Sequence, residues 1–229
     1  MPPVRSLLAA LALVSLQCAA APFGLQVGDV RLGFDLPGGF TDSMPTGSPR
    51  LLELAESFTP ASSRILVFAL SDADMRRFNG GDAPDLKQYL LVVTPRALEQ
   101  ERMTAAAFDA YVRDGLRTLG TPAGDGDFLK LMEARPAGES TLLAELRREP
   151  DAVSVLRGVR LPATDSGFFG SLFSKPSQYV LASTTLLLLR GKAINLTVTT
   201  GYESKADLEW IRATTLRWVD DLRRLNVSR

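Results

Sequence analysis

The chain lacks histidine altogether, and Cys18 is the single cysteine among its 229 residues. Catalytic triads built on histidine, Cys-His pairs and His-ligated zinc or haem are therefore excluded. One cysteine cannot form a disulfide within the chain. The sequence therefore lacks the residues for the commonest catalytic and metal-binding sites.

A net charge is also missing, because 26 lysines and arginines balance 26 aspartates and glutamates. A balanced chain has no overall field that attracts nucleic acid. The pairs Arg76-Arg77, Arg147-Arg148 and Arg223-Arg224 are short and have acidic residues nearby, which is typical of solvated helix faces. We therefore expect no nucleic-acid partner.

Enzyme motifs that work without histidine are absent too. The sequence contains no Ser-x-x-Lys, no Gly-x-Ser-x-Gly and no glycine-rich loop for phosphate or a dinucleotide. Ser174-Lys175 and Ser204-Lys205 are adjacent pairs, whose side chains point in different directions on a strand or helix. We predict that the protein is not an enzyme and uses no cofactor.

The first twenty residues have the pattern of an export signal. Arg5 supplies a positive start, Leu7–Leu16 is a short apolar run, and small residues follow at 18–21. The run is shorter than the roughly 20 apolar residues that span a membrane. We expect residues 1–20 to be a signal peptide and 21–229 to form one mature domain with no transmembrane span, located in the periplasm or secreted.

The spacing of apolar residues predicts strands and helices along the mature chain. The expected strands are Val27–Leu36, Ile65–Leu70, Gln88–Val93, Ala152–Leu161, Tyr179–Leu189 and Ala193–Thr199. The expected helices are 49–59, Ser71–Phe78, Thr104–Leu119, Thr141–Arg148 and a closing helix that begins at Ser204. Ile65–Leu70 is a continuous apolar run, which indicates a strand covered on both faces.

The C-terminal third shows the clearest pattern. Arg190-Gly191-Lys192 separates two strands and predicts a hairpin, and Ser204 with Asp207 forms a capping box. The closing helix has one apolar stripe, made of Leu208, Ile211, Thr215, Trp218, Leu222 and Leu225. Strands that turn back on themselves predict the α+β class, with an antiparallel sheet flanked by helices.

Both ends of the expected domain resemble PsbP-like proteins. The resemblance rests on three segments: Phe34-Asp35-Leu36-Pro37-Gly38-Gly39-Phe40, the hairpin through Arg190-Gly191-Lys192, and a closing helix with Trp210 and Trp218. The resemblance implies an antiparallel sheet sandwiched by helices, and an assembly or accessory role. Metal binding through histidine, described for some relatives, has no matching position here, so no site is carried over.

Two acidic pairs are candidates for calcium. Asp72 and Asp74 lie at a helix start, and Asp125 and Asp127 alternate with glycine in a loop. Neither pair is followed by the further carboxylates of a calcium loop, so helix capping and a solvated turn explain them more simply. We expect no metal site, with calcium at Asp125 and Asp127 as the open alternative.

One apolar loop is the candidate for docking a partner. Phe168, Phe169, Leu172 and Phe173 lie in a stretch rich in glycine and serine without a regular period. Such side chains either cover the core or form an exposed patch that binds a partner. With the export signal, the second hypothesis predicts a cell-envelope accessory or binding protein with an envelope protein as partner. The alternative is a carboxylate-dependent hydrolase or a calcium-stabilised enzyme of the periplasm.

The signal pattern makes a direct prediction. The mature protein should begin near Ala21 or Pro22, because small residues precede that point. N-terminal sequencing of the exported protein checks this. A lipid attached to Cys18 would contradict it and would place the protein on a membrane surface.

Overall fold

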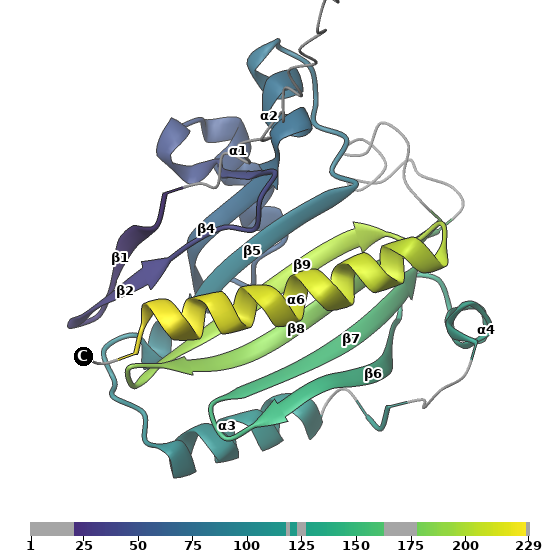
Figure 1. Ribbon diagram of the computed structural model, residues 1–229. Coiled ribbons are helices and arrows are strands. Elements are labelled where there is room, and N and C mark those ends of the chain that lie inside the picture. Colours follow the sequence, from purple (N-terminus) through teal and green to yellow (C-terminus); the bar gives the residue numbers. More distant parts are fainter. Residues whose placement is uncertain (1–20, 118–119, 123–126, 163–177, 228–229) are drawn as a thin grey trace, which may run out of the picture.

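The computed structural model describes residues 21–117, 120–122, 127–162 and 178–227. Within them, a seven-stranded antiparallel sheet has the strand order β3-β4-β5-β9-β8-β7-β6, and β1 and β2 form a separate hairpin. Five α-helices accompany the two sheets in the described residues (Figure 1). The predicted α+β class, an antiparallel sheet flanked by helices, is confirmed.

The strands are β1 Phe23–Val27, β2 Val30–Phe34, β3 Phe40–Asp42, β4 Ser63–Ser71, β5 Gln88–Pro95, β6 Ser140–Glu149, β7 Ala152–Arg160, β8 Tyr179–Leu189 and β9 Lys192–Gly201. The α-helices are α1 Pro49–Ser57, α2 Asp72–Asn79, α3 Ala105–Arg117, α4 Phe128–Glu133 and α6 Lys205–Leu225. Short 3-10 helices occupy Met44–Thr46 and Arg96–Leu98.

Helix α6 covers one face of the sheet. The predicted capping box is present at its start, where the side chains of Ser204 and Asp207 each accept a hydrogen bond from the backbone N–H of the other residue. Ile211, Trp218 and Leu222 are buried in the largest apolar cluster, together with side chains of the sheet and of β2. Figure 1 shows α6 lying across β8 and β9. The expected stripe is correct except at its end, because Leu225 is 40% exposed.

The other face of the sheet is covered by separate helices. Clusters of apolar side chains pack α1 and α2 against β4 and β5, and α3 against β7 and β8. In β4, Phe68 and Leu70 belong to the α1–α2 side, while Val67 and Ala69 belong to the α6 side. This confirms that the run Ile65–Leu70 is a strand with two covered faces.

The helix expected over Thr141–Arg148 is wrong, because these residues lie in β6. This strand pairs with β7 from Ser140 opposite Val159 to Glu149 opposite Ala152. The register shifts twice along the way, between Leu142 and Ala144 and between Glu145 and Arg147. Each irregularity interrupts the period of two, so the apolar residues acquire a spacing that resembles a helix.

The strand expected over Val27–Leu36 is also wrong in extent. It is divided by a turn at Gly28 and Asp29, and only Val30–Phe34 continues as β2. Gly28 has a φ of 55°, and a Cβ there would meet the backbone oxygen of Glu99. A glycine is therefore required where this hairpin packs on the neighbouring loop. The strands β1 and β3 and helix α4 were not expected from the sequence.

The packing of α6 on the sheet can be tested at Trp218. This residue is 2% exposed and donates its indole N–H to the Asp35 carbonyl at 2.7 Å. Trp218→Ala should lower the free energy of unfolding by about 3–5 kcal/mol, since it removes a large buried side chain. Trp218→Phe keeps most of the ring and should cost about 1–2 kcal/mol for the lost hydrogen bond. Urea unfolding measures both, and an unchanged midpoint for Trp218→Ala would contradict this packing.

Candidate functional site

Part of the sequence-based site lies beyond the described structure. Phe168, Phe169, Leu172 and Phe173, the candidate docking residues, are outside the described residues, and so is Asp125. The docking-loop hypothesis therefore stays a prediction. The site below is built from described residues alone.

The described members of the two acidic pairs lie at helix starts. The Asp74 N–H donates to Ser71 Oγ, the cap of α2, and Asp74 Oδ1 accepts from the Asp85 N–H at 2.7 Å. Asp127 caps α4 by accepting from the Leu129 N–H at 3.1 Å. In the described part of the chain, no three acidic or cysteine side chains gather as a metal would require. Of these carboxylates, Asp127 therefore caps a helix, Asp74 joins α2 to the loop at Asp85, and Asp72 accepts from Thr41 Oγ1.

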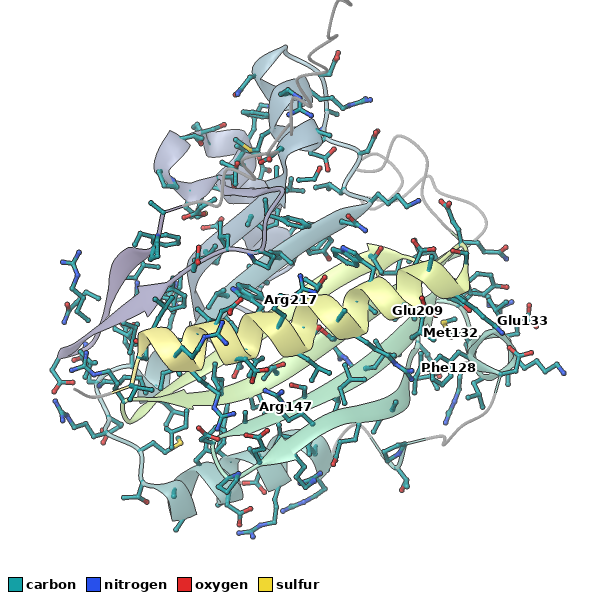
Figure 2. All side chains as sticks on the ribbon, viewed as in Figure 1. Phe128, Met132, Glu133, Arg147, Glu209 and Arg217 are labelled. Atoms are coloured by element: carbon teal, nitrogen blue, oxygen red, sulfur yellow. The ribbon has the colours of Figure 1, made fainter. Side chains whose placement is uncertain are left out.

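The largest charged cluster joins α6 to the turn between β6 and β7. Arg147 binds Asp220 at 2.5 Å, and Arg223 binds Glu149 at 2.5 Å and Asp151 at 3.0 Å. The Arg147 guanidinium lowers the pKa of Asp220. Figure 2 shows Arg147 on the same side of the sheet as α6. Each of these charges has an opposite partner, so the cluster holds the helix in place.

A second cluster surrounds the fully buried Lys192. Its Nζ donates to the carbonyls of Glu99 at 3.0 Å and Glu101 at 2.9 Å, and it binds Asp29 at 2.9 Å. Arg102 also binds Asp29, at 2.7 Å. All three donors of the ammonium are used. Lys192 therefore ties the β1–β2 turn and the loop after β5 to the β8–β9 hairpin.

A cleft of about 390 Å³ lies between α3 and the β6–β7 hairpin, and it contains Asp109 and Glu149. A glycosidase would need one of two such carboxyls to be buried and protonated. Asp109 is 60% exposed and pairs with Arg113, and Glu149 is 36% exposed and pairs with Arg147 and Arg223. The cleft thus lacks the buried acid of the hydrolase alternative.

A different surface lies on the sheet face opposite α6, between α1–α2 and α3. Its first row of cross-strand neighbours runs over β5, β9, β8 and β7 and consists of Tyr89, Thr199, Ala182 and Arg157. Directly opposed residues of antiparallel strands point to the same face. The row therefore places an arginine, two hydroxyls and a methyl on one side of the sheet.

The second row continues the polar character. It consists of Leu91, Thr197, Thr184 and Val155 in the same strand order. The third row meets α3, whose Tyr111 hydroxyl donates to Asn195 Oδ1 at 3.1 Å. We call the five polar side chains of the first two rows the polar patch: Tyr89, Arg157, Thr184, Thr197 and Thr199.

Two atoms of the polar patch are shielded from solvent and have no hydrogen-bond partner among the described residues. They are Arg157 Nε and Thr199 Oγ1. The nearest acceptor that the Arg157 guanidinium reaches is Thr184 Oγ1, at 3.4 Å from Nη2, a long contact. No ion pair of the described residues includes Arg157. A half-buried cation without a carboxylate is unusual, because burying charge costs free energy.

The electrostatics of the patch follow from this burial. Burial lowers the pKa of Arg157, and the nearby Tyr89 opposes that shift. Burial raises the pKa of Tyr89, while the hydroxyl of Thr199 and the charge of Arg157 lower it. Tyr89 also stacks on Phe58 with ring centroids 4.8 Å apart, so its position is fixed by the apolar cluster below α1.

Two other arginines show how such a charge is usually accommodated. Arg160 and Arg212 also have a shielded Nε without a partner. Arg160, however, donates to the Arg135 carbonyl at 3.1 Å, and Arg212 lies over the Phe128 ring at 5.7 Å. Figure 2 shows Phe128 on α4. Arg157 has neither a carbonyl nor a ring contact of this kind in the described residues.

The sequence analysis did not single out Arg157. A signal is present, because Arg157 follows Val153 and Val155 and precedes Val159 at a spacing of two residues. One face of β7 is therefore apolar apart from one arginine. The other members of the patch are threonines and a tyrosine in strands, which alone indicate only β propensity.

No protein-family model matches the chain, and a search of curated proteins finds no match. A solved structure of a mutant of the protein Mog1 is similar over 90% of this chain and 93% of its own, with 12% identity and a TM-score of 0.36. None of the described helices has the length and apolar content to cross a membrane.

The Lys192 cluster predicts an acid dependence of stability. Hydrogen bonds from Lys192 and Arg102 lower the pKa of Asp29 from 3.8 to about 2. Because the folded-state pKa is the lower one, this contribution is complete above the unfolded pKa and is lost as the pH falls toward the folded one. Asp29→Asn should destabilise the fold at neutral pH and flatten the fall in stability between about pH 4 and 2. Urea midpoints across this range measure it.

Asp114→Asn is the matched control, since Asp114 pairs with Arg117 on the exposed side of α3. This variant should keep the acid dependence of the original chain. If Asp29→Asn kept it as well, the Lys192 cluster would not contribute in the way described.

The polar patch predicts the effect of removing its charge. Arg157→Met should leave the free energy of unfolding unchanged or raise it by about 1 kcal/mol, because it removes a half-buried charge without a partner. Arg147→Met, the control, should lower it by about 1 kcal/mol, since Asp220 and Glu149 lose a partner. Thermal unfolding compares them, and a loss of about 2 kcal/mol in Arg157→Met would identify a structural arginine.

Proposed function

We propose that the protein is an exported accessory or binding protein of the cell envelope, periplasmic or secreted, that docks an envelope protein through the polar patch. The observation that supports this most is the half-buried guanidinium of Arg157, whose Nε has no acceptor. A buried donor without an acceptor calls for an explanation, and an acceptor group supplied by a partner protein is one. The signal pattern and the resemblance to PsbP-like proteins favour the same class.

The composition of the patch favours binding over catalysis. It contains one guanidinium and four hydroxyls, all of which donate hydrogen bonds. It contains no carboxylate, lysine, cysteine or histidine that would accept a proton near neutral pH. Such a surface recognises acceptor groups and supplies no general base. The apolar docking loop at Phe168–Phe173 is proposed as a further element of the same role.

Site-specific photo-crosslinking in the cells that export the protein tests this function. A photoreactive side chain would replace Thr184 in the patch or, as the control, Arg217 on the exposed side of α6 (Figure 2). We expect a discrete cross-linked envelope protein from position 184 and none from position 217. Cross-linking from position 217 alone would show that the partner binds the other side, and no cross-link at either position would contradict a docking role.

A further inference from the structure

We propose that Arg157 receives a carboxylate group of the partner protein, as the anchor of the docking surface; this rests on the function proposed above. The polar patch holds one positive charge and no negative charge on its five side chains. A partner that places an acidic side chain or its C-terminal carboxylate here supplies the missing charge. Charge complementarity of this kind gives an interface its specificity.

The donors of the patch suit a planar group with two oxygens. In Arg157, Nε is unpartnered and Nη2 makes only the 3.4 Å contact to Thr184. These two nitrogens form one edge of the guanidinium, which binds both oxygens of a carboxylate in parallel. No strong bond within the described residues holds this edge. Because Nε is shielded from solvent, the side chain must turn outward to meet the carboxylate.

The hydroxyls next to the arginine complete the site. Thr199 Oγ1 makes no hydrogen bond of ordinary geometry, although it interacts with the hydroxyl of Tyr89, its direct neighbour on β5. Both belong to the first row with Arg157, with Ala182 between them and the arginine. The hydroxyls of Thr199 and Tyr89 thus lie on the β9 and β5 side of a carboxylate bound at Arg157.

A phosphate fits this patch less well than a carboxylate. Phosphate sites usually combine several cations or a row of backbone N–H groups, because the group carries close to two negative charges. In the polar patch a single cation is present, and the backbone N–H groups of its strands are engaged in the sheet. One guanidinium with hydroxyl neighbours matches the single charge of a carboxylate.

NMR of the Arg157 side chain in the exported protein tests the assignment. The Nε–H signal of Arg157 is identified by its loss in Arg157→Gln. It is then followed while acetate, inorganic phosphate or chloride is added at equal ionic strength. Two blocked tripeptides, glycine–aspartate–glycine and glycine–asparagine–glycine, separate a protein-borne carboxylate from a free one. Arg212→Gln is the control, because Arg212 also has an unpartnered Nε but lies over Phe128.

We expect acetate and the aspartate peptide to shift the Arg157 signal to saturation, and chloride and the asparagine peptide not to do so. Binding measured from backbone shifts of β7 and β8 should weaken at least about tenfold in Arg157→Gln, as expected for the loss of a charge-assisted hydrogen bond. It should be unchanged in Arg212→Gln. Binding of acetate but not of the aspartate peptide would overturn a protein-borne ligand.

Saturation by phosphate alone, or no shift with any probe, would overturn the carboxylate assignment. If Arg157→Gln does not fold, the thermal midpoint of the original chain in acetate against chloride gives the same decision. The two proposals fail separately. Cross-linking from position 184 without a carboxylate effect would keep the docking surface and remove Arg157 as its anchor, whereas a carboxylate effect without cross-linking would leave a free small acid as the ligand.

Discussion

The seating of α6 on the sheet is the constraint on which the rest of the structure depends. One long helix and the β1–β2 hairpin pack on one face, where their apolar side chains are buried in the largest cluster of the described residues. The opposite face is covered by shorter helices, α1 and α2 over β4 and β5, and α3 over β7 and β8. Between these two covered regions, strands β9, β8 and β7 carry polar side chains. The different cover of the two faces thus determines where polar side chains of the sheet can form a site.

The half-buried cation of the polar patch has different surroundings from other buried or half-buried cations of the structure. Lys192 is fully buried, yet its ammonium has two carbonyls and a carboxylate as partners. Arg147 and Arg223 are likewise matched by acids along α6. Arg157 differs from these, because among the described residues its guanidinium reaches only Thr184 Oγ1, at 3.4 Å, and no carboxylate, carbonyl or ring. Natural sequences accept such local costs mainly at functional sites, which is why the contrast points to binding.

The sequence predicts those parts of the fold that rest on local periodicity. The C-terminal hairpin, the capping box of α6 and the burial of Trp218 follow from spacing alone. Strand β6 is missed because two register irregularities disturb its alternation. The polar patch is missed for another reason. Tyr89, Arg157, Thr184 and Thr199 are far apart in the chain and become neighbours only through strand order and register, which periodicity does not determine.

The most direct test compares two neighbouring positions of β8. Ser183 points to the α6 side and bonds to Thr215 at 2.5 Å, whereas Thr184 belongs to the polar patch. Since Cys18, in the expected signal, is the single cysteine, a cysteine placed at either position is the sole thiol of the mature protein. The rate of thiol labelling in the folded protein should be clearly higher for Thr184→Cys than for Ser183→Cys, because Thr184 is half-buried and Ser183 is fully buried. Equal protection of both would contradict an accessible patch opposite α6.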